Sequence, residues 1–260
     1  MMTKMLSEFL FYKDRQVIFS HAEVIESLHN FSEWKRKAWR QFSIKLHDSE
    51  FPCIFSKSAW KAKSIKFVFC EKRKDSEYLD FLHGLVSYSD YINDTPLSKR
   101  LLSPLVVFFS PEYYINKNQH ETGWEALNWA HARDSKPWPE NISVSPEDAE
   151  WTFYFNGIQF FINMSTQNHR ILRNRNLGAH LTFVINAREN FDAVANGNTK
   201  AGRQLREHIR ERVREYNGGV FPSELGFYGD DANLEWKQYQ LEESGTERPQ
   251  QCPFRHRKTT

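Results

Sequence analysis

The sequence predicts an α+β protein in which a mixed or antiparallel central sheet is flanked by helices within a single domain. The first indication is the order of the expected elements, which is helix, strand, helix, strand, helix, then three strands and a helix. The second is size, since 260 residues fit one large domain, or at most two, at roughly 150 residues per domain, and no break in composition marks a boundary. The third is the aromatic content of 15%, which indicates a core built largely from rings.

Hydrophobic spacing defines the elements of the first half of the chain. Apolar residues three and four apart predict helices, whereas alternating or short continuous apolar runs predict strands, and the run from Leu105 is short enough to be buried on both faces. The expected elements are a helix over Glu23–Phe42, a strand over Ile65–Cys70, a helix over Ser76–Ile92, a strand over Leu105–Ser110 and a helix over Glu121–Arg133.

The clearest local signal lies in the middle of the chain. Asn156-Gly157 separates two apolar runs, Trp151–Phe155 and Ile158–Met164. This dipeptide tolerates the positive φ angles of a two-residue type I′ turn. The sequence therefore predicts a β-hairpin at this place.

Two further elements complete the expected fold. A strand is expected over Ala179–Asn186, and an amphipathic helix over Gly202–Tyr216. The helix is expected to end at Asn217-Gly218-Gly219 through a left-handed cap. Between them, Glu189 and Asp192 are interpreted as acidic residues near a helix start rather than as catalysts.

Composition excludes several classes of protein. The 35 Lys and Arg against 33 Asp and Glu leave a net charge of +2, which is too near balance to favour nucleic acid as a partner. The longest unbroken apolar run, Leu105–Phe109, is far shorter than the roughly 20 residues that span a bilayer, and charged residues interrupt Met1–Phe19 where a signal peptide needs an apolar core. Three cysteines without a CxxC pair suit a reducing compartment. The sequence predicts a soluble, cytoplasmic protein that binds neither nucleic acid nor membranes.

Several common catalytic motifs are absent from the sequence. There is no GxGxxG and no GxxxxGKS or GxxxxGKT, so the usual phosphate-binding loops have no support. There is also no GxSxG and no HExxH, which removes the commonest serine-hydrolase and zinc-protease motifs. Any redox reaction would therefore need electrons from a separate donor.

A polar loop between the hairpin and the next strand carries the clearest functional signal. Residues 163–178 contain His169 and three arginines, Arg170, Arg173 and Arg175, and no acidic residue. Such a cationic loop either binds an anionic ligand or pairs with carboxylates elsewhere in the fold. A haem group would use both residue types, because its iron takes a histidine and its propionates take cationic donors.

Short blocks of the chain resemble one family, in that family's order. The blocks are Phe51-Pro52-Cys53-Ile54-Phe55, Asn156-Gly157-Ile158-Gln159-Phe160-Phe161-Ile162-Asn163, Asn168-His169-Arg170, Arg175-Asn176-Leu177-Gly178, Glu235-Trp236-Lys237-Gln238-Tyr239 and Cys252-Pro253-Phe254. As a set they are specific, and with them the chain resembles the YqcI/YcgG family from Phe51 to Phe254. On this resemblance, residues 1–45 form an N-terminal helical extension and residues 46–260 form a YqcI/YcgG-like haem-binding domain.

The resemblance implies haem-dependent N-hydroxylation by a monooxygenase. Similar members are the arginine hydroxylase of D-cycloserine biosynthesis and the hydroxylase of guanitoxin biosynthesis, which oxidise a guanidine nitrogen with haem and dioxygen. The expected cofactor is haem b, the co-substrate is dioxygen, and the substrate is a guanidino or amino compound such as L-arginine or an arginine derivative. Electrons would come from a ferredoxin or flavodoxin system, or from peroxide. The sequence leaves open whether the protein forms a homodimer.

Three residues compete for the place of the axial iron ligand. His169 is the first choice for the metal, because it lies in a matching block beside the three loop arginines, which are expected to hold the propionates. Cys53 is the main competitor, since a thiolate would favour cleavage of the O–O bond; alternatively it is a small buried residue of a strand. Cys252 is a third option, which requires the C-terminal tail to fold back.

A guanidinium substrate is planar and cationic, so its pocket should offer a carboxylate and an aromatic face. Glu125 and Trp129 lie four residues apart on an expected helix and supply both. Glu235, in a matching block, is the second carboxylate expected to take a catalytic part. A tryptophan at helical spacing is, however, also typical of a hydrophobic core.

Two other functions remain open from the sequence. A haem-binding carrier or sensor without turnover would use the same ligand and the same basic loop. A haem-free binding module would use the basic helix over Gly202–Tyr216 to contact an acidic partner. Glu207, Glu211 and Glu215 balance much of the charge of that helix, which favours a solvated face instead.

Overall fold

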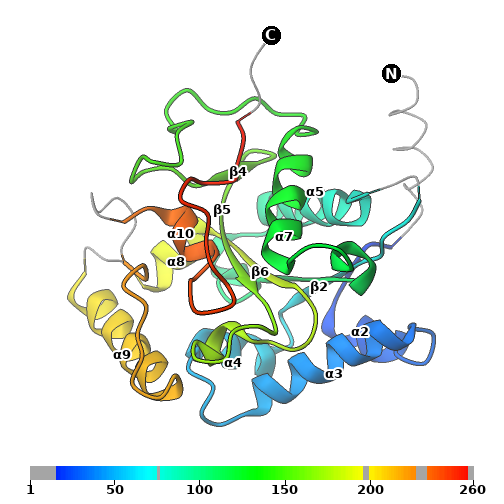
Figure 1. Cartoon of the computed structure of the whole chain (residues 1–260), viewed down its shortest axis with the longest axis horizontal. Helices are drawn as coiled ribbons and strands as arrows, with labels where there is room; N and C mark the ends of the chain where they lie inside the picture. The colour runs from blue at the N-terminus through cyan, green and yellow to red at the C-terminus, as the bar shows by residue number, and fades with distance from the viewer. Residues whose placement is uncertain (1–15, 75–76, 196–198, 227–232, 257–260) are drawn as a thin grey trace.

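The computed structural model describes residues 16–74, 77–195, 199–226 and 233–256, and these form a six-stranded sheet in the order β1-β2-β3-β6-β5-β4 (Figure 1). The strands are β1 (Ile18–Phe19), β2 (Lys66–Cys70), β3 (Leu105–Phe109), β4 (Phe153–Phe155), β5 (Ile158–Ser165) and β6 (Thr182–Ala187). Strands β2 and β3 are parallel, and the other neighbouring pairs are antiparallel. The sheet is therefore mixed, and the predicted α+β class is confirmed.

Helices cover both faces of this sheet (Figure 1). They are α2 (His21–Ser27), α3 (Glu33–His47), α4 (Ile54–Ala62), α5 (Leu79–Asp94), α6 (Leu97–Arg100), α7 (Gln119–His131), α8 (Arg188–Val194), α9 (Lys200–Tyr216) and α10 (Glu235–Tyr239), with short 3₁₀ turns η1 (Pro111–Tyr114) and η2 (Arg173–Arg175). Helices α5 and α7 pack on one face, and α2, α3 and α4 pack on the other. Within the described ranges, no helix is both long and apolar enough to cross a bilayer.

Strand β5 shows how the sheet separates its two faces. Because side chains alternate along a strand, Phe160, Ile162 and Met164 join the core under α5 and α7. The alternate residues Phe161 and Asn163 point to the opposite face, where they line cavities. On the second face, helices pack closely against β2 and β3, whereas cavities lie against β5 and β6. We call the part of this face at β5 and β6 the hollowed face.

The helix expected over Glu23–Phe42 is wrong in its continuity, because the chain contains two helices here. Helix α2 ends at Ser27, and α3 begins at Glu33 after the N-cap residue Ser32. The apolar spacing continues across the break because Phe31, in the connection, packs on Phe69 of the same sheet face, with ring centroids 4.9 Å apart. Spacing alone thus reports a shared buried face and does not reveal a break in the backbone.

Helix α4 was not expected, and it corrects the placement of Cys53 in a strand. Cys53 is the N-cap of α4, and its Sγ accepts a hydrogen bond from the backbone N–H of Ser56 at 3.4 Å. Cysteine is not among the residues that usually signal a helix start, which are Ser, Thr, Asp and Asn. The half-buried thiol of Cys53 therefore lies at the positive end of a helix.

The hairpin prediction is confirmed. Phe155 pairs with Ile158, so that Asn156 and Gly157 form a two-residue turn with φ angles of 48° and 89°. Positive φ at both positions is what a type I′ turn requires. The turn fixes the register of β5, and thereby decides which of its side chains face the hollowed side of the sheet.

Candidate active site

The histidine of the basic loop is buried, and both of its ring nitrogens have partners. His169 is 1% exposed. Its Nε2 lies 3.1 Å from the carbonyl oxygen of Leu241, and its Nδ1 lies 3.4 Å from Oγ1 of Thr166. Burial lowers the pKa of His169, so the imidazole is neutral near pH 7. For His169 to bind a metal through Nε2, the contact with Leu241 would first have to be given up.

The three arginines of the loop point to different surroundings. Arg170 and Arg173 are exposed, and the Arg173 guanidinium lies 4.6 Å from the ring centroid of Tyr216 in α9. Arg175 is only 3% exposed, and burial lowers its pKa to about 9. The loop therefore does not present a single cationic surface, and the role of these arginines as propionate donors stays a prediction.

A carboxylate that is distant in the sequence meets this loop. Glu243 accepts the backbone N–H groups of Arg170, Ile171 and Leu172, at 2.7, 3.0 and 2.6 Å. These hydrogen bonds outweigh the effect of burial and lower the pKa of Glu243. Glu243 thus holds the backbone of the loop and not its arginine side chains, and the expected pairing of those arginines with carboxylates stays a prediction.

A second buried histidine adjoins His169 and gives the protein a pH dependence that can be measured. The ring of His120 in α7 lies 5.4 Å from that of His169, and burial, with nearby His169 and Arg175, lowers the pKa of His120 to about 3. Unfolded histidine titrates near pH 6.5, so protons bind preferentially to the unfolded chain below this pH. As the pH drops from 6.5 toward 3, we expect His120 alone to lower the free energy of unfolding by about 1 kcal/mol per pH unit. Urea unfolding of His120→Gln should show a shallower slope.

The exposed His208 on α9 provides the control for this measurement. His208→Gln should keep the slope of the wild-type protein. Equal slopes for His120→Gln and wild type would show that His120 is not held neutral by burial.

Glu125 and Trp129 do not form an empty cage. The Glu125 carboxylate pairs with Lys117 and accepts a hydrogen bond from the Tyr78 hydroxyl at 2.8 Å; burial opposes these two contacts, but together they lower the pKa of Glu125. The Trp129 ring is covered by the guanidinium of Arg133, 3.7 Å from the ring centroid. Both residues belong to α7, on the sheet face opposite the hollowed one.

Glu235, in contrast, lies at a pocket. It is the first residue of α10 and is 1% exposed. Its Oε1 accepts hydrogen bonds from Thr152 Oγ1 at 2.6 Å and from the Tyr239 hydroxyl at 2.7 Å. Its Oε2 pairs with Arg188, the first residue of α8. Both carboxylate oxygens are therefore occupied, and Glu235 can hold Arg188 in place.

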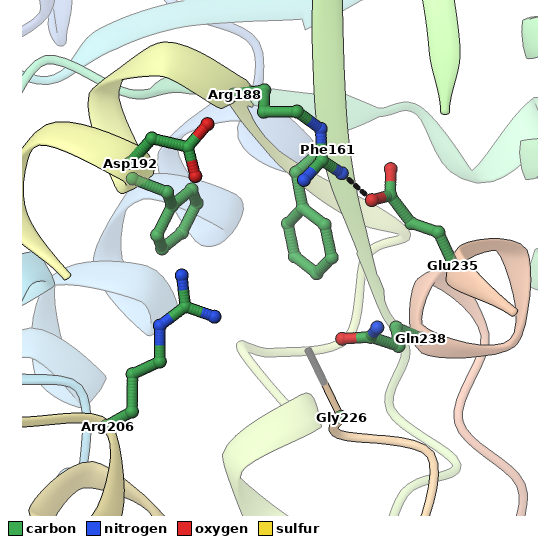
Figure 2. A pocket seen from close by; sticks show the side chains of 8 residues that line it. Phe161, Arg188, Asp192, Arg206, Gly226, Glu235 and Gln238 are labelled. Atoms are coloured by element: carbon green, nitrogen blue, oxygen red, sulfur yellow. Dashed lines mark ion pairs between the residues drawn. The ribbon is translucent and has the colours of Figure 1, made fainter. Parts of the chain in front are cut away.

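The pocket beside this ion pair combines charged and aromatic side chains (Figure 2). It contains about 490 Å³ of empty space, a figure that includes the open solvent at its mouth. We call it the polar pocket, and its lining is Phe161, Arg188, Phe191, Asp192, Arg206, Gly226, Glu235 and Gln238. Elements β5, α8, α9 and α10 each contribute to it.

Two mostly apolar cavities lie along the hollowed face in addition to the polar pocket. The first, which we call the connecting cavity, contains about 450 Å³ of empty space with open solvent included. It shares Phe191 with the polar pocket and has Asn186 and Cys53 in its wall. The second, which we call the apolar cavity, contains about 580 Å³ of empty space with open solvent included. It also has Cys53 in its wall and lies between Val184 of β6 and Val213 of α9. Cys53 is thus common to both, whereas His169 is not among the residues that line either cavity.

Cys252, the third candidate ligand, belongs to the core on the other side of the sheet. It is 4% exposed and packs in the cluster that includes Trp151 and Phe254. Burial raises the pKa of its thiol to about 12. The tail does fold back, as the ligand role requires, but it places Cys252 among aromatic rings.

The residues that the structure describes contain no group of three or more His, Cys, Asp and Glu side chains arranged to hold a metal ion. A haem iron needs only one or two axial ligands and takes its other four donors from the porphyrin. This observation therefore bears on a protein-held metal ion and not on haem.

Comparison with known proteins identifies the family. The YqcI/YcgG family matches residues 42–255. The chain belongs to the YqcI/YcgG family. It is 40% identical over 227 residues to a Streptomyces lavendulae protein named "Putative N(omega)-hydroxy-L-arginine synthase DcsA", covering 86% of this chain and 85% of the relative.

Two further members of the YqcI/YcgG family come from Bacillus subtilis (strain 168). YcgG is 31% identical over 233 residues, with 87% of this chain and 90% of the relative covered. YqcI is 27% identical over 228 residues, with 85% and 87% covered. No solved structure matches the chain.

The YqcI/YcgG match includes every residue of the polar pocket, several of which the sequence did not single out for a site. Asp192 was interpreted as an acidic residue near a helix start, and Arg206 was one of many basic residues on an amphipathic helix. Glu189, by comparison, pairs with Arg100 at 2.6 Å. No local spacing distinguishes Asp192 from Glu189, because only the fold brings α8, α9 and α10 together.

Proposed function

We propose that this protein is a haem-dependent monooxygenase that N-hydroxylates a guanidino substrate, L-arginine or an arginine derivative, with dioxygen and an external reductant. The name of the Streptomyces lavendulae relative supports arginine N-hydroxylation. The observation that carries the proposal is the position of the polar pocket beside two apolar cavities; Phe191 lines both the polar pocket and the connecting cavity. The polar pocket offers a place for a charged substrate, and the apolar cavities offer a place for a flat apolar cofactor.

The apolar side of this site has properties that a haem group requires. Haem needs an apolar cavity with an axial donor in its wall. The apolar cavity supplies hydrophobic walls from Phe42, Leu46 and Val213, and Cys53 is its donor. Cys53 is the N-cap of a helix of nine residues, which places its sulfur at the N-terminal end of that helix, at the wall of the cavity.

The geometry supports Cys53 over His169 as the axial ligand. Cys53 already faces two cavities, whereas His169 is buried with both nitrogens in contact with neighbours. Ligation by His169 would leave the carbonyl of Leu241 without its present partner, which costs about 1–3 kcal/mol for a buried group. His169 therefore remains the competing ligand, and the Soret bands of the Cys53→Ser and His169→Gln variants distinguish the two residues.

When bound, the haem iron would supply the activation of dioxygen. In the overall reaction, one oxygen atom enters an N–H bond of the substrate and the other leaves as water, which takes up two electrons and two protons. The sequence has no usual nucleotide-binding loop, so a ferredoxin or flavodoxin system supplies the two electrons. Alternatively, peroxide replaces dioxygen together with the electrons and protons. The chain itself binds and orients the substrate and excludes water.

Turnover is the direct test of this function. We expect purified protein loaded with hemin to convert L-arginine to an N-hydroxylated product in the presence of reductant and dioxygen, as measured by mass spectrometry. Incubation under nitrogen, or without reductant, should give no product. A protein that binds haem but forms no product from arginine or related guanidines would instead be a carrier or sensor.

A further inference from the structure

The polar pocket contains opposite charges at separate positions in its wall. Arg188 and Glu235 form the buried ion pair on one side, and Asp192 and Arg206 approach from the other (Figure 2). Two arginines and two carboxylates give the lining a formal charge of zero. A ligand that carries both a negative and a positive group would match this distribution of charge.

Arg188 is held as a fixed cation at the inner end of the pocket. It is 8% exposed, and its partner Glu235 has Thr152 and Tyr239 on its remaining oxygen. Since both oxygens of Glu235 are engaged, this carboxylate offers no further oxygen to a substrate cation. The inner end of the pocket is thus suited to a negatively charged group.

Arg206 directs a second guanidinium to the same space. Its Nε donates a hydrogen bond to the carbonyl oxygen of Ala195 at 2.5 Å, which fixes the plane of the group. Figure 2 shows its terminal nitrogens pointing into the pocket, and both Arg188 and Arg206 line it. Two arginines that converge on one space are typical of carboxylate recognition.

Acceptors for a positive group lie at other points of the wall. Asp192 is exposed at the mouth. Gln238 is 7% exposed, and its Nε2 donates to Oδ1 of Asn233 at 3.1 Å. Figure 2 shows the amide oxygen of Gln238 turned to the pocket. An ammonium group next to a carboxylate can therefore be bound here.

We propose that the polar pocket binds the head group of a free α-amino acid, with the α-carboxylate on Arg188 and Arg206 and the α-ammonium on Asp192 and Gln238. The inference rests on the proposed function and specifies its substrate as an amino acid with both termini free. The side chain then extends past Phe191, which lines the polar pocket and the connecting cavity, toward the cavity wall that contains Cys53. This orientation keeps the charged head group away from the apolar cavity.

Calorimetric titration of the hemin-loaded protein with L-arginine and with agmatine tests this assignment. Agmatine keeps the guanidinium but lacks the carboxylate. Because charge-assisted hydrogen bonds to a carboxylate are about twice as strong as neutral ones, we expect agmatine to bind about 10- to 100-fold more weakly than L-arginine. Arg206→Gln should weaken L-arginine binding about tenfold or more and leave agmatine binding unchanged.

Arg203→Gln is the matched control, because Arg203 is exposed on the same helix and does not line the pocket. This variant should bind L-arginine like the wild type. Equal affinities for L-arginine and agmatine, or an Arg206→Gln variant that weakens both ligands equally, would overturn the head-group assignment. If L-arginine is hydroxylated although L-arginine and agmatine bind equally well, the head-group assignment is wrong and the proposed function is supported. If L-arginine binds more tightly than agmatine but no hydroxylated product forms, the head-group assignment is supported and the proposed function is wrong.

Discussion

The Cys53→Ser variant is expected to lose the Soret band of the hemin-loaded protein, because the hydroxyl of serine is a poor ligand for haem iron. Serine has nearly the size of cysteine and is a preferred N-cap residue. Helix α4, whose N-cap is Cys53, should therefore keep its start. The far-ultraviolet circular dichroism spectrum and the urea midpoint should stay close to those of the wild type, so that loss of the band reports loss of the ligand.

Two other variants complete this experiment. His169→Gln retains a side-chain donor for the carbonyl of Leu241, and it should retain the Soret band if Cys53 is the ligand. Cys252→Ala should also retain it, since Cys252 lies in the core on the other face of the sheet. A band that is lost in His169→Gln and kept in Cys53→Ser would show instead that His169 binds the iron. Wild-type protein that stays colourless with added hemin would refute haem binding altogether.

The sequence predicted the elements whose signals are local. The Asn156-Gly157 turn depends on two residues that tolerate positive φ, so neighbouring sequence determines it. Strand β3 was expected from a short apolar run, and its five residues are all buried. The break between α2 and α3 was missed because Phe31 maintains the apolar spacing across it. Helix α4 was missed because its cap is a cysteine.

The site was harder to predict, since its residues depend on tertiary structure. Proximity in sequence suggested that Arg170, Arg173 and Arg175 act together, yet the 3₁₀ turn η2 and its flanks expose two of them and bury the third. Glu235 was expected to take a catalytic part, which stays a prediction; the structure places it in the lining of the polar pocket, where it pairs with Arg188. Arg206 lies on a helix of alternating charge, where no pattern separates it from its solvated neighbours.

The buried pair of Arg188 and Glu235 should dominate the stability of this part of the protein. Arg188→Met removes the cation and leaves the Glu235 carboxylate 1% exposed with hydrogen bonds only from Thr152 and Tyr239. Leaving one buried charge without its partner costs about 3–5 kcal/mol, and we expect a loss of this size in the free energy of unfolding, as measured in urea.

The expected loss arises because the Glu235 carboxylate is kept away from water without a cation beside it. A second variant separates this desolvation cost from the attraction between the two charges. In the double variant Arg188→Met, Glu235→Gln, the buried carboxylate is gone as well, and an amide of similar shape can still accept from Thr152 or Tyr239. Because replacing both ions of a buried pair is often close to neutral, the double variant should unfold at a higher urea concentration than Arg188→Met alone. The exposed pair of Arg214 and Glu211 on α9 provides the comparison: Arg214→Met should change stability by less than about 1 kcal/mol. A double variant less stable than the single one would mean that Glu235 contributes through its own hydrogen bonds more than it loses through burial, and that Arg188 is not what keeps its charge in place.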